Sequence, residues 1–359
     1  MTEGRINLYS DTQSRPTLEM RQAMLGAEVG DEQKGLDKSV NRLCDHVADL
    51  LGKEAAVFLP SGTMCNEIAI LVQCKPGDEV YADRTVHILN FETGGPAALA
   101  GVNIYPLPGQ HGIYTPEMLE TAIRLETRYA PRSRLVSVEQ TSNLGGGTIW
   151  PMETIRRVAQ IARSRELLLH LDGARLMNAV VASGIPARDY CCYFDSAWVD
   201  LSKGLGCPVG GVLAGTQSFI DDAWLWKQRL GGAMRQAGML AAAGLYAFDH
   251  HINRLADDHE NARRLGEIVS GHSMIQLDPQ YIETNIVLID ISETGLSAFE
   301  VCQQLEQDGI NIGAVNATVL RAITHLDIDA AQIEEAGQAL LKTIDAMMKA
   351  PSPKSLPLS

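Results

Sequence analysis

The stretch Asp195-Ser-Ala-Trp-Val-Asp-Leu-Ser-Lys-Gly-Leu-Gly-Cys-Pro-Val-Gly-Gly211 joins two short apolar runs through a lysine and a cluster of glycines. The first run ends at Ser202-Lys203, and the second begins at Val209. A lysine at the end of a strand, beside glycines, can approach a planar ligand, and a buried lysine forms a Schiff base with a carbonyl ligand. Taken alone, Lys203 is more simply interpreted as a solvated lysine, because most lysine side chains are exposed.

The composition indicates a globular protein of more than one domain. The chain has 359 residues, which exceeds the roughly 250–300 residues that one hydrophobic core usually holds. Its net charge of −14 argues against nucleic acid or an anionic membrane as a partner. Seven scattered cysteines form no disulfide framework and no metal-ligand pair, so we expect no metal site. The N-terminus lacks an apolar signal core, and no apolar run reaches the ~18 residues of a membrane span, so we expect a cytoplasmic protein.

Strands and helices alternate along the first two thirds of the chain. Helices are expected at 16–27 and 37–51, and then at 63–74, 91–100, 116–125 and 151–165. Strands are expected at 55–59, 79–82, 102–107, 134–138 and 167–171, before the two apolar runs described above. This alternation predicts an α/β fold with a mostly parallel sheet that is flanked by helices. Ligands of such sheets bind at the carboxyl ends of the strands.

The pattern changes after residue 214 and indicates a smaller α+β C-terminal domain. A helical stretch runs from 217 to 270 with a break at Gly231-Gly232, and strands at 285–291 and 319–323 alternate with helices at 297–308 and 330–349. We therefore expect an N-terminal segment (1–15) that contributes to the active site, a large ligand-binding domain (16–250), a small domain (251–349) and a tail (350–359).

Two further loops carry residues suited to an anionic, aromatic ligand. Ser61-Gly-Thr63 precedes a helix, whose free N–H groups could bind a phosphate; an ordinary N-cap is the alternative. Asp172 ends an aliphatic strand, where a buried carboxylate needs a partner such as a protonated heterocyclic nitrogen. A pair with Arg175 or a helix N-cap would also satisfy it.

Together, the phosphate cradle, Asp172 and Lys203 match the three needs of pyridoxal 5′-phosphate. Its phosphate, its pyridinium N–H and its aldehyde require a cradle, a carboxylate and a lysine, and this chain carries the three in that order. This combination is far more specific than any one of its parts, and it favours a catalytic Lys203.

The sequence resembles the low-specificity L-threonine aldolase family, of the aspartate-aminotransferase-like fold type I, over nearly all its length. The motifs that carry the resemblance include Ser10-Asp-Thr12, Pro60-Ser-Gly-Thr63, His87 with Glu92-Thr-Gly-Gly95, His170-x-Asp-Gly-Ala-Arg-Leu176, Leu201-Ser-Lys-Gly-Leu-Gly206, Met234-Arg-Gln-Ala-Gly238 and Thr324-His-Leu-Asp327. The resemblance implies cleavage of L-threonine, L-allo-threonine and related β-hydroxy-α-amino acids to glycine and an aldehyde, by a homotetramer that is a dimer of dimers.

The resemblance also assigns roles to individual residues. Lys203 would hold the cofactor, Asp172 would pair with its ring nitrogen, and His87 would stack on the ring near the substrate hydroxyl. Ser61, Gly62 and Thr63 would bind the phosphate, with Arg235 reaching it, and Arg175 would contact cofactor and substrate. Ser10, Arg175 and Arg321 would hold the substrate carboxylate.

Departures from the family pattern leave other functions open. Tyr129 stands where many members have a histidine that is considered as base or substrate contact, so Tyr129 is a candidate substrate contact and the base is unassigned. Alanine racemisation or β-elimination on the same cofactor is one alternative, and a non-catalytic binding protein is another. A nicotinamide enzyme is disfavoured, since no GxGxxG joins the first strand to its helix.

Overall fold

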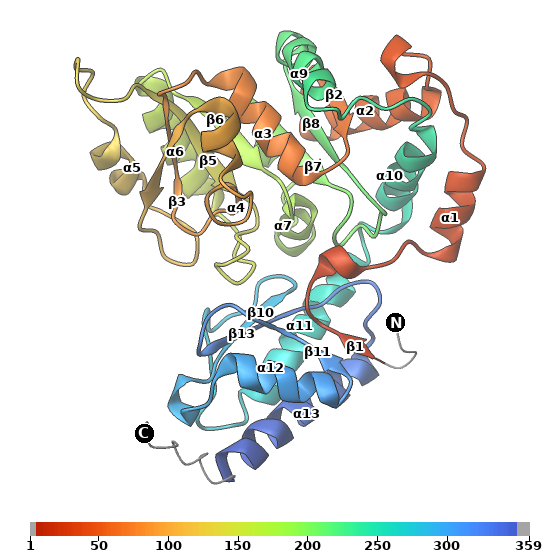
Figure 1. Cartoon of the computed structure of the whole chain (residues 1–359), viewed down its shortest axis with the longest axis vertical. Helices are drawn as coiled ribbons and strands as arrows, with labels where there is room; N and C mark the ends of the chain where they lie inside the picture. Colours follow the sequence, from red (N-terminus) through yellow and green to blue (C-terminus); the bar gives the residue numbers. More distant parts are fainter. Residues whose placement is uncertain (1–4, 350–359) are drawn as a thin grey trace, which may run out of the picture. The chain divides into compact units, whose positions relative to one another are not determined.

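The computed structural model describes residues 5–349, so the expected tail at 350–359 lies outside the described residues. The chain forms two compact units (Figure 1). The larger is Asp11–Asp257, and the smaller combines the residues up to Ser10 with those from Asp258 onward. The division falls within helix α11 (Leu255–Val269), a continuous helix whose sequence periodicity gives no boundary signal.

A seven-stranded sheet forms the centre of the larger unit. Its strands lie in the order β2 (Ala55–Leu59), β8 (Gly211–Gly215), β7 (Ser196–Asp200), β6 (Leu168–Asp172), β5 (Ser133–Glu139), β3 (Glu79–Asp83) and β4 (Asn103–Leu107). Only β8 is antiparallel to its neighbours, β2 and β7. The predicted α/β class with a mostly parallel sheet is therefore confirmed.

Helices cover both faces of this sheet (Figure 1), and the alternation of strand side chains decides which residue meets which helix. One face packs against α2 (Lys38–Leu51), α6 (Met152–Ser164), α8 (Ala187–Cys191) and α10 (Gly238–His250). The other face packs against α3 (Gly62–Gln73) and α9 (Gln217–Arg229). Along β6, Leu169 and Leu171 belong to the first face, while His170 and Asp172 reach Asn66 of α3.

The segment 87–100 differs from the single helix expected at 91–100. It contains a short helix, α4 (His87–Asn90), and one π-helical turn, Pro96–Ala100. Between them, Thr93 and Gly94 have φ angles of 54° and 72°, in the left-handed region that interrupts a right-handed helix. Because glycine has no Cβ, Gly94 adopts this left-handed conformation without steric cost. Two helices that the sequence analysis did not place, α7 (Leu176–Ser183) and α8, follow β6.

The remaining helices of the larger unit are peripheral: α1 (Leu18–Leu25), which packs on α10, and α5 (Pro116–Ala122), which packs on α6. In the smaller unit, an antiparallel sheet runs in the order β12 (Gly313–Ala314), β13 (Val319–Ile323), β10 (Ile286–Asp290) and β9 (Gln276–Leu277). A second ladder pairs β1 (Ile6–Asn7) with β11 (Ile310–Asn311). With α12 (Ala298–Gln307) and α13 (Ala330–Lys349), this unit has the predicted α+β character. Within residues 5–349, no helix is long and apolar enough to cross a bilayer.

We predict that Leu169→Ala strongly destabilises the larger unit. Leu169 lies in the middle of β6 with 0% exposure, so its truncation leaves a cavity under the site and should cost about 2–5 kcal/mol of unfolding free energy. Leu125→Ala is the matched control, because that leucine is 76% exposed and should change the unfolding free energy by less than ~0.5 kcal/mol. Urea unfolding followed by tryptophan fluorescence measures both. Equal losses in the two variants would contradict the assigned core.

Candidate active site

The candidate site lies where β6 and β7 end and α3 begins. Asp172 is the last residue of β6, and Lys203 follows the end of β7 by three residues. Since the two strands are parallel neighbours, both residues emerge at the same edge of the sheet. The first turn of α3 faces β7, because a Cβ added to Gly62 would lie 2.3 Å from Trp198 Cη2.

Asp172 is a buried carboxylate, 2% exposed, that is held in place by two hydrogen bonds. Oδ1 accepts from the Ala174 backbone N–H at 3.0 Å, and Oδ2 accepts from Asn66 Nδ2 at 2.8 Å. Burial raises the pKa of Asp172, against the opposing charges of His87 and Lys203. Both groups that donate to it are neutral, so a cationic N–H remains the most favourable additional partner.

Arg175 is not the cationic partner of Asp172, although the sequence analysis left that pairing open. Its guanidinium forms a bidentate ion pair with Asp11, with Nε and Nη2 each 2.8 Å from a carboxylate oxygen. Ser14 Oγ donates to the Lys203 carbonyl at 2.9 Å. Residues 11–14 are therefore attached directly to the ends of β6 and β7.

His87 begins α4 and is fixed on two sides. Its backbone N–H donates to Glu139 Oε2 at 2.6 Å, and its Nδ1 lies 2.8 Å from Glu92 Oε1. Burial lowers the pKa of His87, but the hydrogen bond to Glu92 and the charges of Asp172, Glu92 and Glu139 outweigh it and leave the pKa raised. His87 is thus oriented by a carboxylate at one ring nitrogen, while its side chain remains partly exposed.

Asn66 connects these groups, and the sequence analysis did not identify it. Its Nδ2 donates to Asp172 and to Glu92, each at 2.8 Å, and its Oδ1 accepts from Trp198 Nε1 at 2.8 Å. His170 Nε2 lies 3.1 Å from the same oxygen and therefore carries the proton; burial lowers the pKa of His170 to about 3, so the ring is neutral. The only sequence signal was a polar residue on the apolar face of α3.

The beginning of α3 has the geometry of a phosphate cradle. Ser61 is the N-cap, with its Oγ accepting from the Met64 N–H at 3.2 Å, and Thr63 is exposed. Lys203 lies beside it: Nζ is 2.7 Å from Asp200 Oδ2, and that oxygen would be 3.1 Å from a Cβ on Gly62. Ser202 orients Asp200 by donating its N–H and its hydroxyl to Oδ1. Asp200 was also missed by the sequence analysis.

These residues fit pyridoxal phosphate on grounds that the structure supplies. A helix N-terminus at which only glycine fits suits a phosphate, a buried carboxylate with neutral donors suits a ring N–H, and a partly buried lysine beside the cradle suits an aldehyde. His87, tied to the same network through Glu92, is the aromatic side chain available to the ring.

The other predicted site residues lie elsewhere. Tyr129 is 96% exposed in the loop before β5, at the amino ends of the strands, so the structure does not bring it to Lys203 of the same chain. Arg235 is exposed and pairs with Asp31 at 3.4 Å; the Gly231-Gly232 turn that precedes it packs on Met64 of α3. Ser10 and Arg321 belong to the smaller unit.

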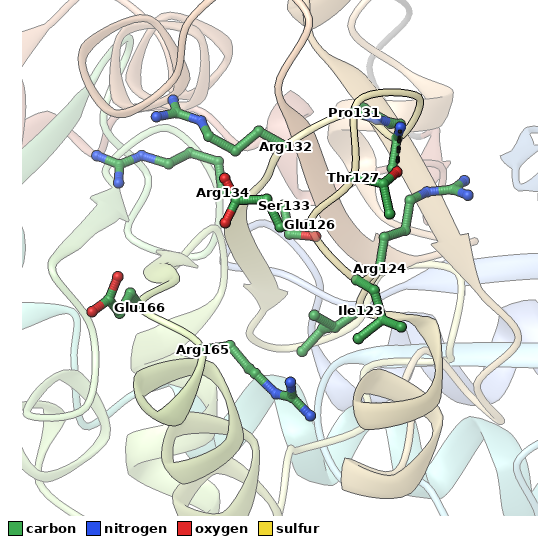
Figure 2. A pocket seen from close by; sticks show the side chains of 12 residues that line it. Ile123, Arg124, Glu126, Thr127, Pro131, Arg132, Ser133, Arg134, Arg165 and Glu166 are labelled. Carbon is green, nitrogen blue, oxygen red and sulfur yellow. Dashed lines mark hydrogen bonds between the residues drawn. The ribbon is translucent and has the colours of Figure 1, made fainter.

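A cavity of about 440 Å3 lies beside the loop before β5, and Figure 2 shows the side chains that line it. Its lining comes from the residues before β5 and β6 and includes Arg132, Arg134 and Arg165. Arg132 already pairs with Asp78, and Arg134 donates to the Gln73 carbonyl. This cavity is therefore at the opposite end of the sheet from Asp172 and Lys203.

Comparison with known proteins agrees with this chemistry. The model of the beta-eliminating lyase family matches residues 7–292. The low specificity L-threonine aldolase of Escherichia coli (strain K12) is 37% identical over 333 residues, covering 92% of this chain and 96% of the relative. Low-specificity L-threonine aldolase 1 of Arabidopsis thaliana is 38% identical over 338 residues, covering 93% and 94%.

Solved structures support the fold. A putative L-allo-threonine aldolase from Listeria monocytogenes superposes with a TM-score of 0.77 at 22% identity, covering 96% of this chain and 95% of the other. Threonine aldolase from Leishmania major gives 0.81 at 19% identity, covering 94% and 99%. Fold and site together define the class of a pyridoxal-phosphate-dependent lyase. Within that class, the chain belongs to the beta-eliminating lyase family and to its low-specificity L-threonine aldolases.

We predict that Gly62→Ala weakens binding of pyridoxal phosphate by at least about tenfold, or ~1.4 kcal/mol. The new Cβ would lie 2.3 Å from Trp198 Cη2, so either the indole or the end of α3 must move out of the cradle. Gly26→Ala is the control, since its Cβ would lie 3.6 Å from the nearest atom. Titration of each purified protein with the cofactor, followed by absorbance, gives the two affinities. Equal affinities would exclude this cradle.

Proposed function

We propose that the protein cleaves L-threonine, L-allo-threonine and related β-hydroxy-α-amino acids into glycine and an aldehyde. The observation that carries this proposal is one polar network in which Asn66 joins Asp172 to Glu92 and His87, next to Lys203 and the cradle. The family of the chain supports it. When bound, the cofactor supplies an electron-withdrawing ring that weakens the bonds to the substrate Cα.

In this proposal the larger unit binds and activates the cofactor. The N–H groups of Gly62 and Thr63, with the Ser61 hydroxyl, hold the phosphate. Asp172 would accept the ring N–H and so stabilise its protonated form. Asn66 holds this carboxylate in position at the edge of the sheet. Lys203, whose Nζ donates to Asp200 Oδ2 at 2.7 Å, would be the amine that holds the aldehyde.

His87 is the proposed base for the β-hydroxyl proton. Glu92 orients the ring through Nδ1, which leaves Nε2 to exchange a proton with the substrate. The carboxylate also stabilises the imidazolium that forms when Nε2 accepts that proton. Since Tyr129 is distant in the same chain, a substrate contact by Tyr129 would require a second copy of the chain.

The substrate carboxylate is proposed to bind Arg175, Arg321 and Ser10. Arg175 uses Nε and Nη2 for Asp11, so Nη1 is the nitrogen it can offer. Arg321 lies on β13 of the smaller unit, paired in register with Leu288 of β10. Holding the carboxylate sets which bond to Cα stands perpendicular to the ring and hence which bond breaks.

We also propose a homotetramer, arranged as a dimer of dimers, in the cytoplasm. The segment from α1 to the start of α2 exposes large apolar side chains, as expected of a surface that another copy covers: Leu18, Leu25, Val29 and Leu36. Arg235 lies next to this segment through its pair with Asp31, so it could reach the phosphate of a neighbouring copy. All seven cysteines are free, which agrees with a reducing compartment.

The family match favours β-elimination as a second candidate function. The same cofactor site would then remove the β-substituent and release ammonia and a keto acid in place of glycine. Scoring threonine, allo-threonine, phenylserine and serine for aldehyde, glycine and ammonia separates the two reactions.

We predict that Lys203→Ala abolishes release of glycine and aldehyde from threonine while the fold persists, because the variant lacks the amine that pairs with Asp200 beside the cradle. Lys75→Ala, at an exposed turn, should keep the wild-type rate. Coupled reduction of the aldehyde measures the turnover of both variants. Wild-type turnover by Lys203→Ala would reject the assignment of the lysine, and absence of glycine with the wild-type protein would reject the proposed reaction.

A further inference from the structure

Glu67 is a buried acid that the proposed reaction does not use. It lies in the second turn of α3, next to Asn66, and is 4% exposed. Among the described residues, no N–H or O–H group donates to either of its carboxylate oxygens. An isolated buried carboxylate is strongly disfavoured, so a carboxyl group in this position is expected to hold a proton or to find an unusual partner.

That partner is Glu92. Its Oε1 accepts from Asn66 Nδ2 and contacts His87 Nδ1, whereas Oε2 has no donor within the part of the chain that the structure describes. The carboxyl groups of Glu67 and Glu92 are close enough to hydrogen bond to each other. Two carboxylates in contact cannot both be ionised cheaply, but one proton between them satisfies Oε2 and one oxygen of Glu67.

We propose that Glu67 and Glu92 share one proton, donated by Glu67 to Glu92 Oε2, and that this acid pair sets the protonation of His87. Glu67 is thus a positioning residue that acts through Glu92. The pair itself does not depend on the proposed function; only its catalytic consequence rests on that function.

The loop that carries Glu92 is built around this contact. A Cβ added to Gly95 would lie 1.9 Å from Glu67 Oε1, so only glycine lets the loop close over the acid. Thr93 has a φ of 54°, a conformation that is costly for a β-branched residue and that persists only where surrounding contacts enforce it. Glu92 is therefore held against Glu67 rather than left to solvent.

Electrostatics agree with one shared proton. Burial, followed by the charge of Glu92 and the hydrogen bond to it, raises the pKa of Glu67 to about 8. Burial and the charge of Asp172 raise the pKa of Glu139, which faces the same network from β5, to about 7. Asp172 from β6 and Cys65 from α3 also lie near Glu92 and His87, and Asp200 and Lys203 act on the same region from the end of β7. The π-helical turn Pro96–Ala100, which packs on α3, carries no titratable side chain.

Ionisation of Glu67 determines the direction in which the proton affinity of His87 changes. At neutral pH Glu67 is protonated and donates to Glu92, which also accepts hydrogen bonds from Asn66 and His87. As the pH rises through about 8, Glu67 releases its proton to solvent. The negative charge that appears on Glu67 then increases the proton affinity of His87. The acid pair thereby keeps His87 available as a base at neutral pH.

Infrared spectroscopy of wild-type protein labelled with 13C-glutamate tests the shared proton. Difference spectra between about pH 6 and about pH 10 should show, besides the band of Glu139 that disappears near 7, the C=O band of a second buried protonated glutamate that disappears with a midpoint near 8. Glu67→Gln, which has the same size and a donor but no ionisable proton, should lack that band. A wild-type spectrum without it would overturn the proposal, even if the variant failed to fold.

NMR titration of the His87 ring tests the coupling. The wild-type ring should show a second inflection near pH 8 that Glu67→Gln lacks, while Glu126→Gln, at an exposed glutamate, should retain it. Loss of this inflection would not follow from a purely structural role, because the glutamine preserves the contact. An unchanged His87 titration in Glu67→Gln would overturn the coupling. Neither readout requires turnover, so a protein with the band but without threonine cleavage would keep the acid pair and reject the aldolase.

Discussion

The hydrogen bonds of the Asn66 side chain are the interaction on which the site depends. One amide on α3 binds Asp172 at the end of β6, Trp198 in β7 and Glu92 in the loop after α4. A buried amide has four hydrogen-bonding positions, and this one uses all of them: two on β6, one on β7 and one on Glu92. The helix that presents the phosphate cradle is therefore fixed in register with the strand that presents the ring carboxylate.

Charge balance explains why such a site needs its ligand. Acids outnumber bases at this sheet edge: Asp11 is paired with Arg175 and Asp200 with Lys203, but Asp172 has only neutral donors. A ring N–H cation would supply the missing partner. Lys203, whose Nζ pairs with Asp200, would hold the aldehyde, and the Asp200 carboxylate borders the cradle.

Sequence patterns identified the candidate site residues that end strands or begin helices. Lys203, Asp172 and Ser61–Thr63 follow apolar runs, and parallel strands bring such positions to one edge. The sequence analysis did not identify Asn66 and Glu67, because they lie inside a helix among apolar residues. The role of a polar side chain there depends on hydrogen-bond partners that are distant in the sequence. The pair of Arg175 with Asp11 spans 164 positions, which no local pattern reveals. The prediction of one helix at 91–100 was wrong, because the Thr93-Gly94 turn interrupts it and holds Glu92 against Glu67. A contact between residues so far apart in sequence is also not visible in a local pattern.

The central claim is that Lys203 holds the cofactor at the edge formed by β6, β7 and α3. Reduction of the protein–cofactor complex with borohydride, followed by peptide mass spectrometry, tests it most directly, because reduction makes the lysine–aldehyde bond permanent. The account predicts the pyridoxyl label on the peptide that contains Lys203, and loss of that label in Lys203→Ala. A label on another lysine, such as Lys227 or Lys53, would contradict it.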